Sequence, residues 1–172
     1  MTTAFSPQRV LFREYLDPIR LKEGKSKCPC CGKLMRAYCK TMDKRLVGLG
    51  YDILDYLEQE KRILFKPADV WGNEADTLVA HRKICDVNKL HYWKLIESLK
   101  GRWTLTRKGF KFLTGRIQVP KSIWVFNDEV VLEDDTMVHV GNVDDRWQKE
   151  RSDYAFDYIQ QKYETEFELQ RV

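Results

Sequence analysis

Three of the five cysteines lie within four positions, in the stretch SKCPCCGKLM. Cys28 and Cys31 have the two-residue gap of a zinc knuckle, in which a tight turn directs both thiolates at one ion. Gly32 follows the second cysteine and can adopt the positive φ that lets backbone amides approach the sulfurs. We therefore expect Cys28 and Cys31 to supply half of a four-ligand, structural zinc site.

Two sets of residues could complete this site. His81 and Cys85 are four residues apart, so on a helix both side chains lie on one face. A Cys-x-x-Cys pair with a His-x-x-x-Cys pair gives the four ligands that zinc prefers, and this is the preferred closure. Cys39, eleven residues after Cys28, is an alternative that would replace His81 or Cys85.

The cysteines also fit two other interpretations. Cys28-Pro29-Cys30-Cys31 matches the dithiol pattern of glutaredoxin-like folds, but that motif follows a buried strand, whereas the charged stretch KEGKSK precedes it here. Thiols that pack in the core and bind nothing are the third interpretation. Disulfides are poor candidates in a reducing compartment, and the odd number of cysteines leaves one unpaired.

Motifs for catalysis are few. The sequence has no glycine-rich phosphate loop, no Gly-x-Ser-x-Gly elbow and no His-Glu-x-x-His. The pairs Asp134-Asp135 and Asp144-Asp145 could bind a divalent cation, although charged turns and helix starts explain such pairs more often. We therefore expect a protein that is not an enzyme and assign no catalytic residue.

Periodicity and turn residues predict mixed helices and strands. Thr41 could cap a long helix to about Lys61, because its apolar residues recur at three- and four-residue steps. A second helix capped within 73–76 runs through Ile84, and Asp86 could cap a third towards Trp93. The remaining expected elements are a helix over 7–16, a hairpin turning at Lys100-Gly101, a short helix begun by Thr106, a hairpin turning at Asn127-Asp128, and a long helix from about Asp144.

The order helix, helix, helix, hairpin and short helix is that of a winged helix. The segment KLHYWKLIESLKGRWTLTRKGFKFL, residues 89–113, resembles winged-helix regulators. In these a leucine-isoleucine strand follows the third helix, and an apolar strand returns to end in Leu-Thr-x-x-Gly. The matching residues are Leu95-Ile96-Glu97 and Trp103-Thr104-Leu105-Thr106-Arg107-Lys108-Gly109. The resemblance covers about 42–115 and implies the fold more strongly than a function, because winged helices also dock proteins.

The charges are strongly segregated along the chain. Residues 100–126 hold seven Lys and Arg and no acidic residue, whereas residues 127–172 hold thirteen acidic and five basic residues. Phosphate contacts need such positive charge, so double-stranded DNA is the expected partner of the basic part. The residues expected to hold phosphates are Lys100, Arg102, Arg107, Lys108 and Lys111. Weaker candidates for reading a groove are Arg82, Asn88, Lys89 and His91, since Asn and Arg can bind base edges bidentately.

A further resemblance covers residues 28–126. It is carried by Cys28-Pro29-Cys30-Cys31-Gly32, Met35-Arg36, the stretch KLHYWKLIE over 89–97, Trp103 to Gly109, and Val119-Pro120-Lys121. These features are similar to a family of small phage-encoded proteins of unassigned role. The resemblance implies a viral origin and action inside a bacterial cell.

We therefore expect an α+β protein with a zinc-knuckle appendage over 1–41, a winged-helix domain over 42–126, and a strand with an acidic C-terminal helix over 127–172. No stretch approaches the roughly 18 apolar residues of a membrane span, so a cytoplasmic protein without a membrane partner is expected. The expected role is DNA binding in gene regulation. The alternative is a protein-binding inhibitor or adaptor that acts on a host polymerase or defence complex through the acidic C-terminal region. The oligomeric state stays open, with a homodimer among the options.

Overall fold

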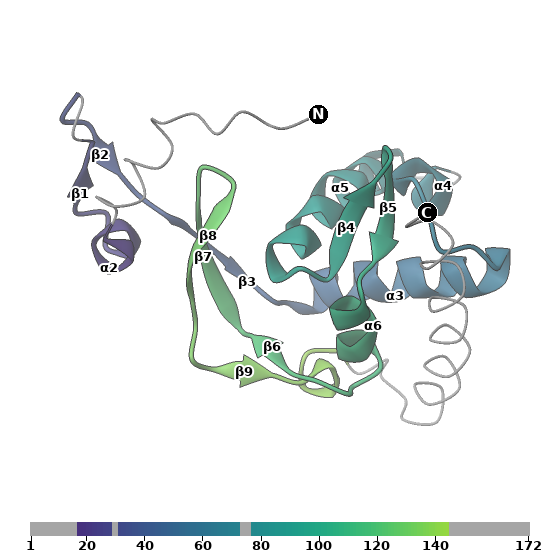
Figure 1. Ribbon diagram of the computed structural model, residues 1–172. Helices are drawn as coiled ribbons and strands as arrows, with labels where there is room; N and C mark the ends of the chain where they lie inside the picture. The colour runs from purple at the N-terminus through teal and green to yellow at the C-terminus, as the bar shows by residue number, and fades with distance from the viewer. Residues whose placement is uncertain (1–16, 29–30, 73–76, 145–172) are drawn as a thin grey trace. The chain divides into compact units, whose positions relative to one another are not determined.

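The computed structural model describes residues 17–28, 31–72 and 77–144 (Figure 1). Helices and strands are mixed, which confirms the expected α+β class. The chain divides into two compact units: unit 1 takes residues 1–40 and 122–133, and unit 2 takes 41–121 and 134–172. The second hairpin thus groups with the N-terminal segment, across the boundaries expected after residues 41 and 126.

Three expected features lie outside the described residues. They are the N-terminal helix over 7–16, the helix cap within 73–76, and nearly all of the acidic C-terminal helix from about Asp144.

Unit 1 is built from short elements. The helix is α2 (Pro18–Lys22), and the strands are β1 (Ser26–Lys27), β2 (Leu34–Met35), β3 (Tyr38–Thr41), β7 (Ser122–Phe126) and β8 (Glu129–Glu133). β1 and β2 form an antiparallel hairpin around the cysteine stretch, and β3, β7 and β8 form a sheet in that order. Helix α2 contacts β8, and the Lys22 ammonium lies 3.9 Å from the ring centre of Trp124. A cation over an indole face is attracted by the ring quadrupole.

The turn between β7 and β8 confirms the second expected hairpin. Asn127 and Asp128 have φ values of 49° and 60°, so both central residues are left-handed. Two-residue hairpins of this type favour Asn, Asp and Gly, because their short side chains tolerate this backbone.

Unit 2 contains most of the helical residues. Its helices are α3 (Lys44–Glu60), α4 (Pro67–Trp71), α5 (Thr77–Val87), the 3₁₀ helix η1 (Asn88–Trp93), α6 (Arg107–Leu113) and the 3₁₀ helix η2 (Val140–Asn142). The long helix α3 buries its apolar stripe as expected, including Leu46, Leu49, Ile53, Leu54 and Leu57. Asp43 caps it, accepting a hydrogen bond from the Leu46 backbone N–H over 2.8 Å, so the cap expected at Thr41 is wrong.

The start predicted for the third helix, a cap at Asp86, is also wrong. Helix α5 continues directly into η1 without a cap at Asp86, because the Asp86 carboxylate is buried and pairs with other groups. It binds the Arg45 guanidinium of α3 and the Lys89 ammonium of η1. Two cations compensate the desolvation of this carboxylate, so it joins α3 to the end of α5 instead of capping a helix.

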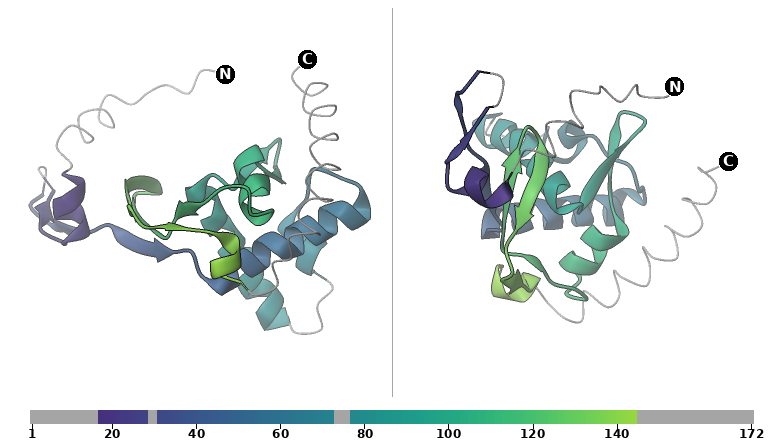
Figure 2. Two further views of the ribbon diagram at one scale, coloured as in Figure 1. Left: turned by 90° about the horizontal axis from the view of Figure 1, so that it is seen from below. Right: turned by 60° about the vertical axis from the view of Figure 1, so that its left-hand side comes forward.

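The first expected hairpin is confirmed. β4 (Ile96–Leu99) pairs antiparallel with β5 (Arg102–Leu105), and the turn residues Lys100 and Gly101 have φ values of 50° and 78°. Phe65, between α3 and α4, adds a bridge to Trp103 through two backbone hydrogen bonds of 2.9 and 2.8 Å. The hairpin projects from the helices of unit 2 in the right-hand view of Figure 2.

A two-stranded sheet of β6 (Val119–Pro120) and β9 (Met137–Val138) completes unit 2. The buried indole N–H of Trp93 donates to the Pro120 carbonyl oxygen over 2.8 Å, which ties η1 to β6. Within the described ranges, no helix has the length and apolar character needed to cross a bilayer.

Candidate nucleic-acid interface and cysteine pairs

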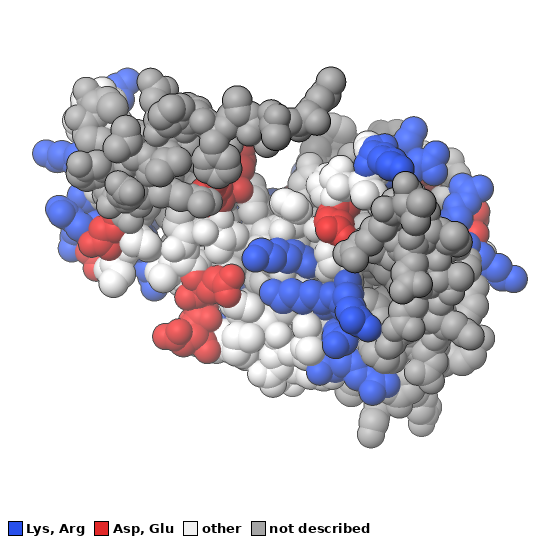
Figure 3. All heavy atoms as spheres, in the orientation of Figure 1, with Lys and Arg blue, Asp and Glu red and all other residues white. Residues whose placement is uncertain are grey.

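The five residues expected to hold phosphates all lie on the β4–β5 hairpin and the helix that follows it. Lys100 is at the tip, Arg102 begins β5, and Arg107, Lys108 and Lys111 are on α6. Lys100, Arg102 and Arg107 are exposed, and Lys108 and Lys111 are half-buried. Figure 3 shows Lys and Arg side chains over the hairpin tip and over α6. The structure therefore provides cations on two consecutive elements, with ammonium and guanidinium groups suited to phosphate oxygens.

The start of α6 is fixed to the base of the hairpin by Thr106. Its hydroxyl accepts a hydrogen bond from the Gly109 N–H over 2.9 Å and donates to the Lys94 carbonyl oxygen over 2.6 Å. Its backbone N–H donates to the Leu95 carbonyl oxygen over 2.9 Å. A Cβ on Gly109 would lie only 2.0 Å from that same oxygen, so glycine is needed for this close approach. The Thr-x-x-Gly pattern therefore sets the position of the α6 cations relative to those of β5.

The four weaker candidates lie along α5 and η1. Two of them, Lys89 and His91, make contacts within the fold. Arg82 and Asn88 are exposed. Lys89 is held in the ion pair with Asp86. The His91 Nδ1 donates to the Ile96 carbonyl oxygen over 3.2 Å, and its ring meets Trp103 edge-on at 6.0 Å. His91 therefore packs at the base of the hairpin, where it supports β4 and β5.

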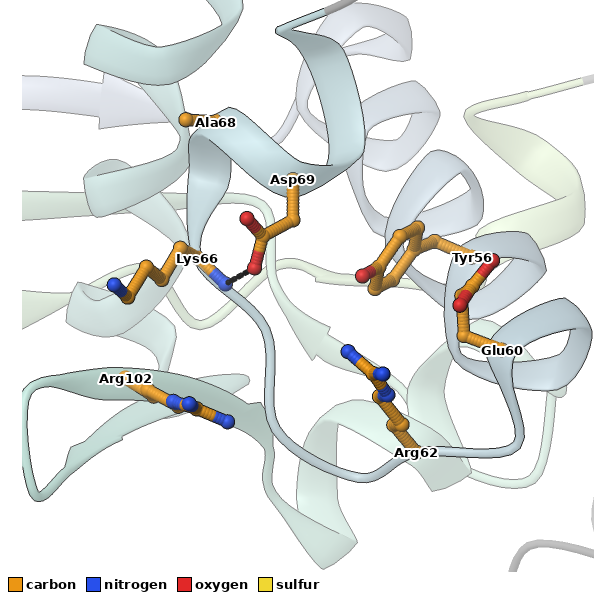
Figure 4. A pocket seen from close by; sticks show the side chains of 7 residues that line it. All are labelled: Tyr56, Glu60, Arg62, Lys66, Ala68, Asp69 and Arg102. Carbon is orange, nitrogen blue, oxygen red and sulfur yellow. Dashed lines mark hydrogen bonds between the residues drawn. The ribbon is translucent and has the colours of Figure 1, made fainter.

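A charged groove that was not predicted from the sequence lies beside the hairpin. The groove is shallow, has a volume of about 520 Å³ and is open to solvent (Figure 4). Its lining residues are Tyr56, Glu60, Arg62, Lys66, Ala68, Asp69 and Arg102. They come from the end of α3, the connection after it, the start of α4 and the first residue of β5. Arg102 was among the expected phosphate contacts, whereas net charge by segment hid Arg62 and Lys66, because residues 51–99 are net acidic.

Cys28 and Cys31 occupy the turn of the β1–β2 hairpin. The Gly32 N–H donates to the Cys28 carbonyl oxygen over 2.8 Å, and the Cys28 N–H donates to the Lys33 carbonyl oxygen over 2.8 Å. Gly32 has a φ of 71°, the left-handed conformation expected for it. A tight turn closed in this way, with a thiol on either side, suits two ligands of a tetrahedral zinc.

His81 and Cys85 lie on one face of α5, as their spacing predicts. The Cys85 Sγ is 3.8 Å from the His81 Nδ1. Cys39 is exposed on β3. Among residues 17–28, 31–72 and 77–144, no three His, Cys, Asp or Glu side chains gather closely enough to hold a metal. The structure thus brings together two pairs of donors, one in each unit.

Unit 2 presents exposed cations on the hairpin, on α6 and in the groove beside β5, and each unit contains one pair of donors that suits zinc. Comparison of the chain with protein-family models, with curated proteins and with solved structures found no match.

Proposed function

We propose that the protein binds double-stranded DNA through unit 2 and acts, without catalysis, as a phage-type regulator of gene expression. The observation that carries this proposal is the bridge between Phe65 and Trp103. If Phe65 is counted as a one-residue strand, the order in unit 2 is helix α3, strand, helix α4, helix α5 and hairpin β4–β5. This is the order of a winged helix, in which α5 would approach the DNA and the hairpin would be the wing.

The charge of these elements supports the same proposal. The proposed wing and α6 carry Lys100, Arg102, Arg107, Lys108 and Lys111. Contacts from such residues to the phosphate backbone supply affinity, and they release counterions when they form. Arg82 and Asn88 on the exposed side of α5 and η1 are the groups left for base edges. We therefore expect strong binding to any duplex and modest dependence on base sequence.

A polarisation titration with a labelled random-sequence duplex tests this proposal. With about five phosphate contacts, affinity should fall on the order of 10²–10³-fold between about 50 and about 200 mM salt. Replacing Lys100, Arg102 and Lys108 by Gln should weaken binding and remove roughly three contacts from the salt slope. The matched control replaces Arg20, Lys27 and Lys33 of unit 1 by Gln, which removes the same charge. Equal affinity of the two triple variants would refute the proposed interface.

The expected alternative, an inhibitor of a host protein, depends on the acidic C-terminal region. Almost all of that region lies outside the described residues. A pull-down from host lysate that survives nuclease treatment, together with an absence of duplex binding, would favour it over DNA binding.

We also propose a structural zinc ion held by Cys28 and Cys31. The turn geometry of the β1–β2 hairpin and the chemistry of two thiolates support this proposal, and zinc bound there would stabilise the short strands of unit 1. His81 and Cys85 would complete the four-ligand set, or Cys39 would take the place of one of these two. Elemental analysis of Cys28→Ser, Cys39→Ser and Cys85→Ser variants tests the proposal. Metal lost in Cys28→Ser and in only one of the other two would identify the closing ligand, whereas full metal content in Cys28→Ser would contradict the site.

A further inference from the structure

We propose that the groove beside β5 is a phosphate-binding subsite, occupied by a backbone phosphate of the bound duplex. The groove is formed by unit 2 alone and has Arg62, Lys66 and Arg102 on its walls. This inference rests on the proposed DNA binding, and it adds Arg62 and Lys66 to the surface formed by the hairpin and α6.

The arrangement of the three cations carries the inference. The bridge between Phe65 and Trp103 is antiparallel, so Lys66 and Arg102, one position further along, are cross-strand neighbours. Like charges placed opposite each other on paired strands are destabilising. Figure 4 shows the guanidinium groups of Arg62 and Arg102 extending toward the space between them from two sides of the groove. An anion in that space would lie between two guanidinium groups and would be attracted by both.

The carboxylates of the groove do not neutralise these cations. Within the described part of the chain, no ion pair joins Arg62, Lys66 or Arg102 to an acidic side chain. The Asp69 carboxylate instead accepts a hydrogen bond from the Lys66 backbone N–H over 3.1 Å, which caps the start of α4. Glu60 lies beside Tyr56 on the far side of the groove (Figure 4). The cationic groups therefore remain available for an external ligand.

The chemistry of the lining favours phosphate over a carboxylate or a simple ion. Two guanidinium forks can each bind two oxygens of a phosphate, an ammonium adds a point charge, and the Tyr56 hydroxyl can donate a hydrogen bond. The groove is open to solvent, so a phosphate within a polymer backbone could enter it. Arg102 is shared with the proposed wing, which makes the groove continuous with that surface.

The test uses the full chain with Arg62 and Lys66 both replaced by Gln. The matched control replaces Lys27 and Lys33, two exposed lysines of unit 1, by Gln. In polarisation titrations with a random-sequence duplex, the groove variant should lower the salt slope by about 1, because the subsite holds one phosphate and each phosphate contact contributes about 0.9. The control should keep the wild-type slope. A groove variant that binds the duplex with the wild-type slope would overturn the subsite and leave the proposed function standing.

A second measurement keeps the two proposals separate. Inorganic phosphate is titrated into the wild-type protein while the Nε–Hε signals of its arginines are followed by NMR. The subsite predicts saturable shifts of the Arg62 and Arg102 signals that exceed the shift of Arg20 in unit 1. If the wild-type protein does not bind the duplex but these signals shift, the phosphate subsite is supported and the proposed DNA binding is refuted. If they shift no more than Arg20, the subsite is overturned, whether or not the double variant folds.

Discussion

Thr106 is the residue on which the position of α6 depends most directly. Its hydroxyl bonds both the Gly109 N–H and the Lys94 carbonyl oxygen. Thr106→Val should lower the free energy of unfolding by about 1–2 kcal/mol, because it removes a helix cap and leaves two backbone groups unpaired. Thr106→Ser retains the hydroxyl and should stay within about 0.5 kcal/mol of wild type. Urea denaturation of both variants checks this, and equal losses would contradict the role of the hydroxyl.

Gly109 is required at the start of α6 for a steric reason. A methyl group there would collide with the backbone oxygen of Leu95, which cannot rotate away as a side chain can. Gly109→Ala should therefore destabilise the fold by about 3 kcal/mol, at the upper end of overpacking, although alanine has the higher helix propensity. The neighbouring Lys108→Ala adds no atom to the core and is the control, expected within about 0.5 kcal/mol. A Gly109→Ala variant as stable as wild type in denaturation would refute the close approach.

At the scale of elements, a substitution in the β4–β5 turn should change protein stability and duplex binding in opposite directions. Lys100 has a left-handed backbone, which is unfavourable for a lysine and favourable for asparagine. Lys100→Asn should raise the free energy of unfolding by about 0.5 kcal/mol and at the same time weaken duplex binding, since one phosphate contact is lost. Denaturation and polarisation on the same sample measure both effects. A variant that loses stability, or that binds duplex as tightly as wild type, would contradict this account of the turn.

The elements that could be predicted from sequence are those with a local signal. The stripe of α3, the cap at Thr106 and the turns at Lys100-Gly101 and Asn127-Asp128 are each encoded by adjacent residues. The two-residue strands β1 and β2 and the five-residue helix α4 carry no readable period. Aspartate is a common helix cap, but the carboxylate of Asp86 binds the guanidinium of Arg45, forty-one positions away in the chain. Only the tertiary structure shows that this carboxylate forms an ion pair instead of a cap.

At the scale of the whole molecule, the segregation of charge could be read from the sequence, whereas the pairing of distant segments could not. The basic stretch 100–126 was evident from composition, and five of its seven cations lie on the hairpin and α6. The sheet of β3, β7 and β8 joins segments about eighty residues apart in the chain, so hairpins read in sequence order could not reveal unit 1. The groove likewise joins the stretch 56–69 to Arg102. Two of its cations, Arg62 and Lys66, were not evident because they lie in a window whose net charge is negative.

The central claim is that unit 2 binds duplex DNA with the β4–β5 hairpin and α6. An NMR titration of the full chain with a short random-sequence duplex tests it most directly. The account predicts the largest backbone amide shifts at Lys100, Gly101, Arg102 and Lys108, with much smaller shifts at Arg20 and Lys27 of unit 1. The shifts should vanish as salt is raised. Shifts confined to unit 1, or none at duplex concentrations in the micromolar range, would contradict the claim.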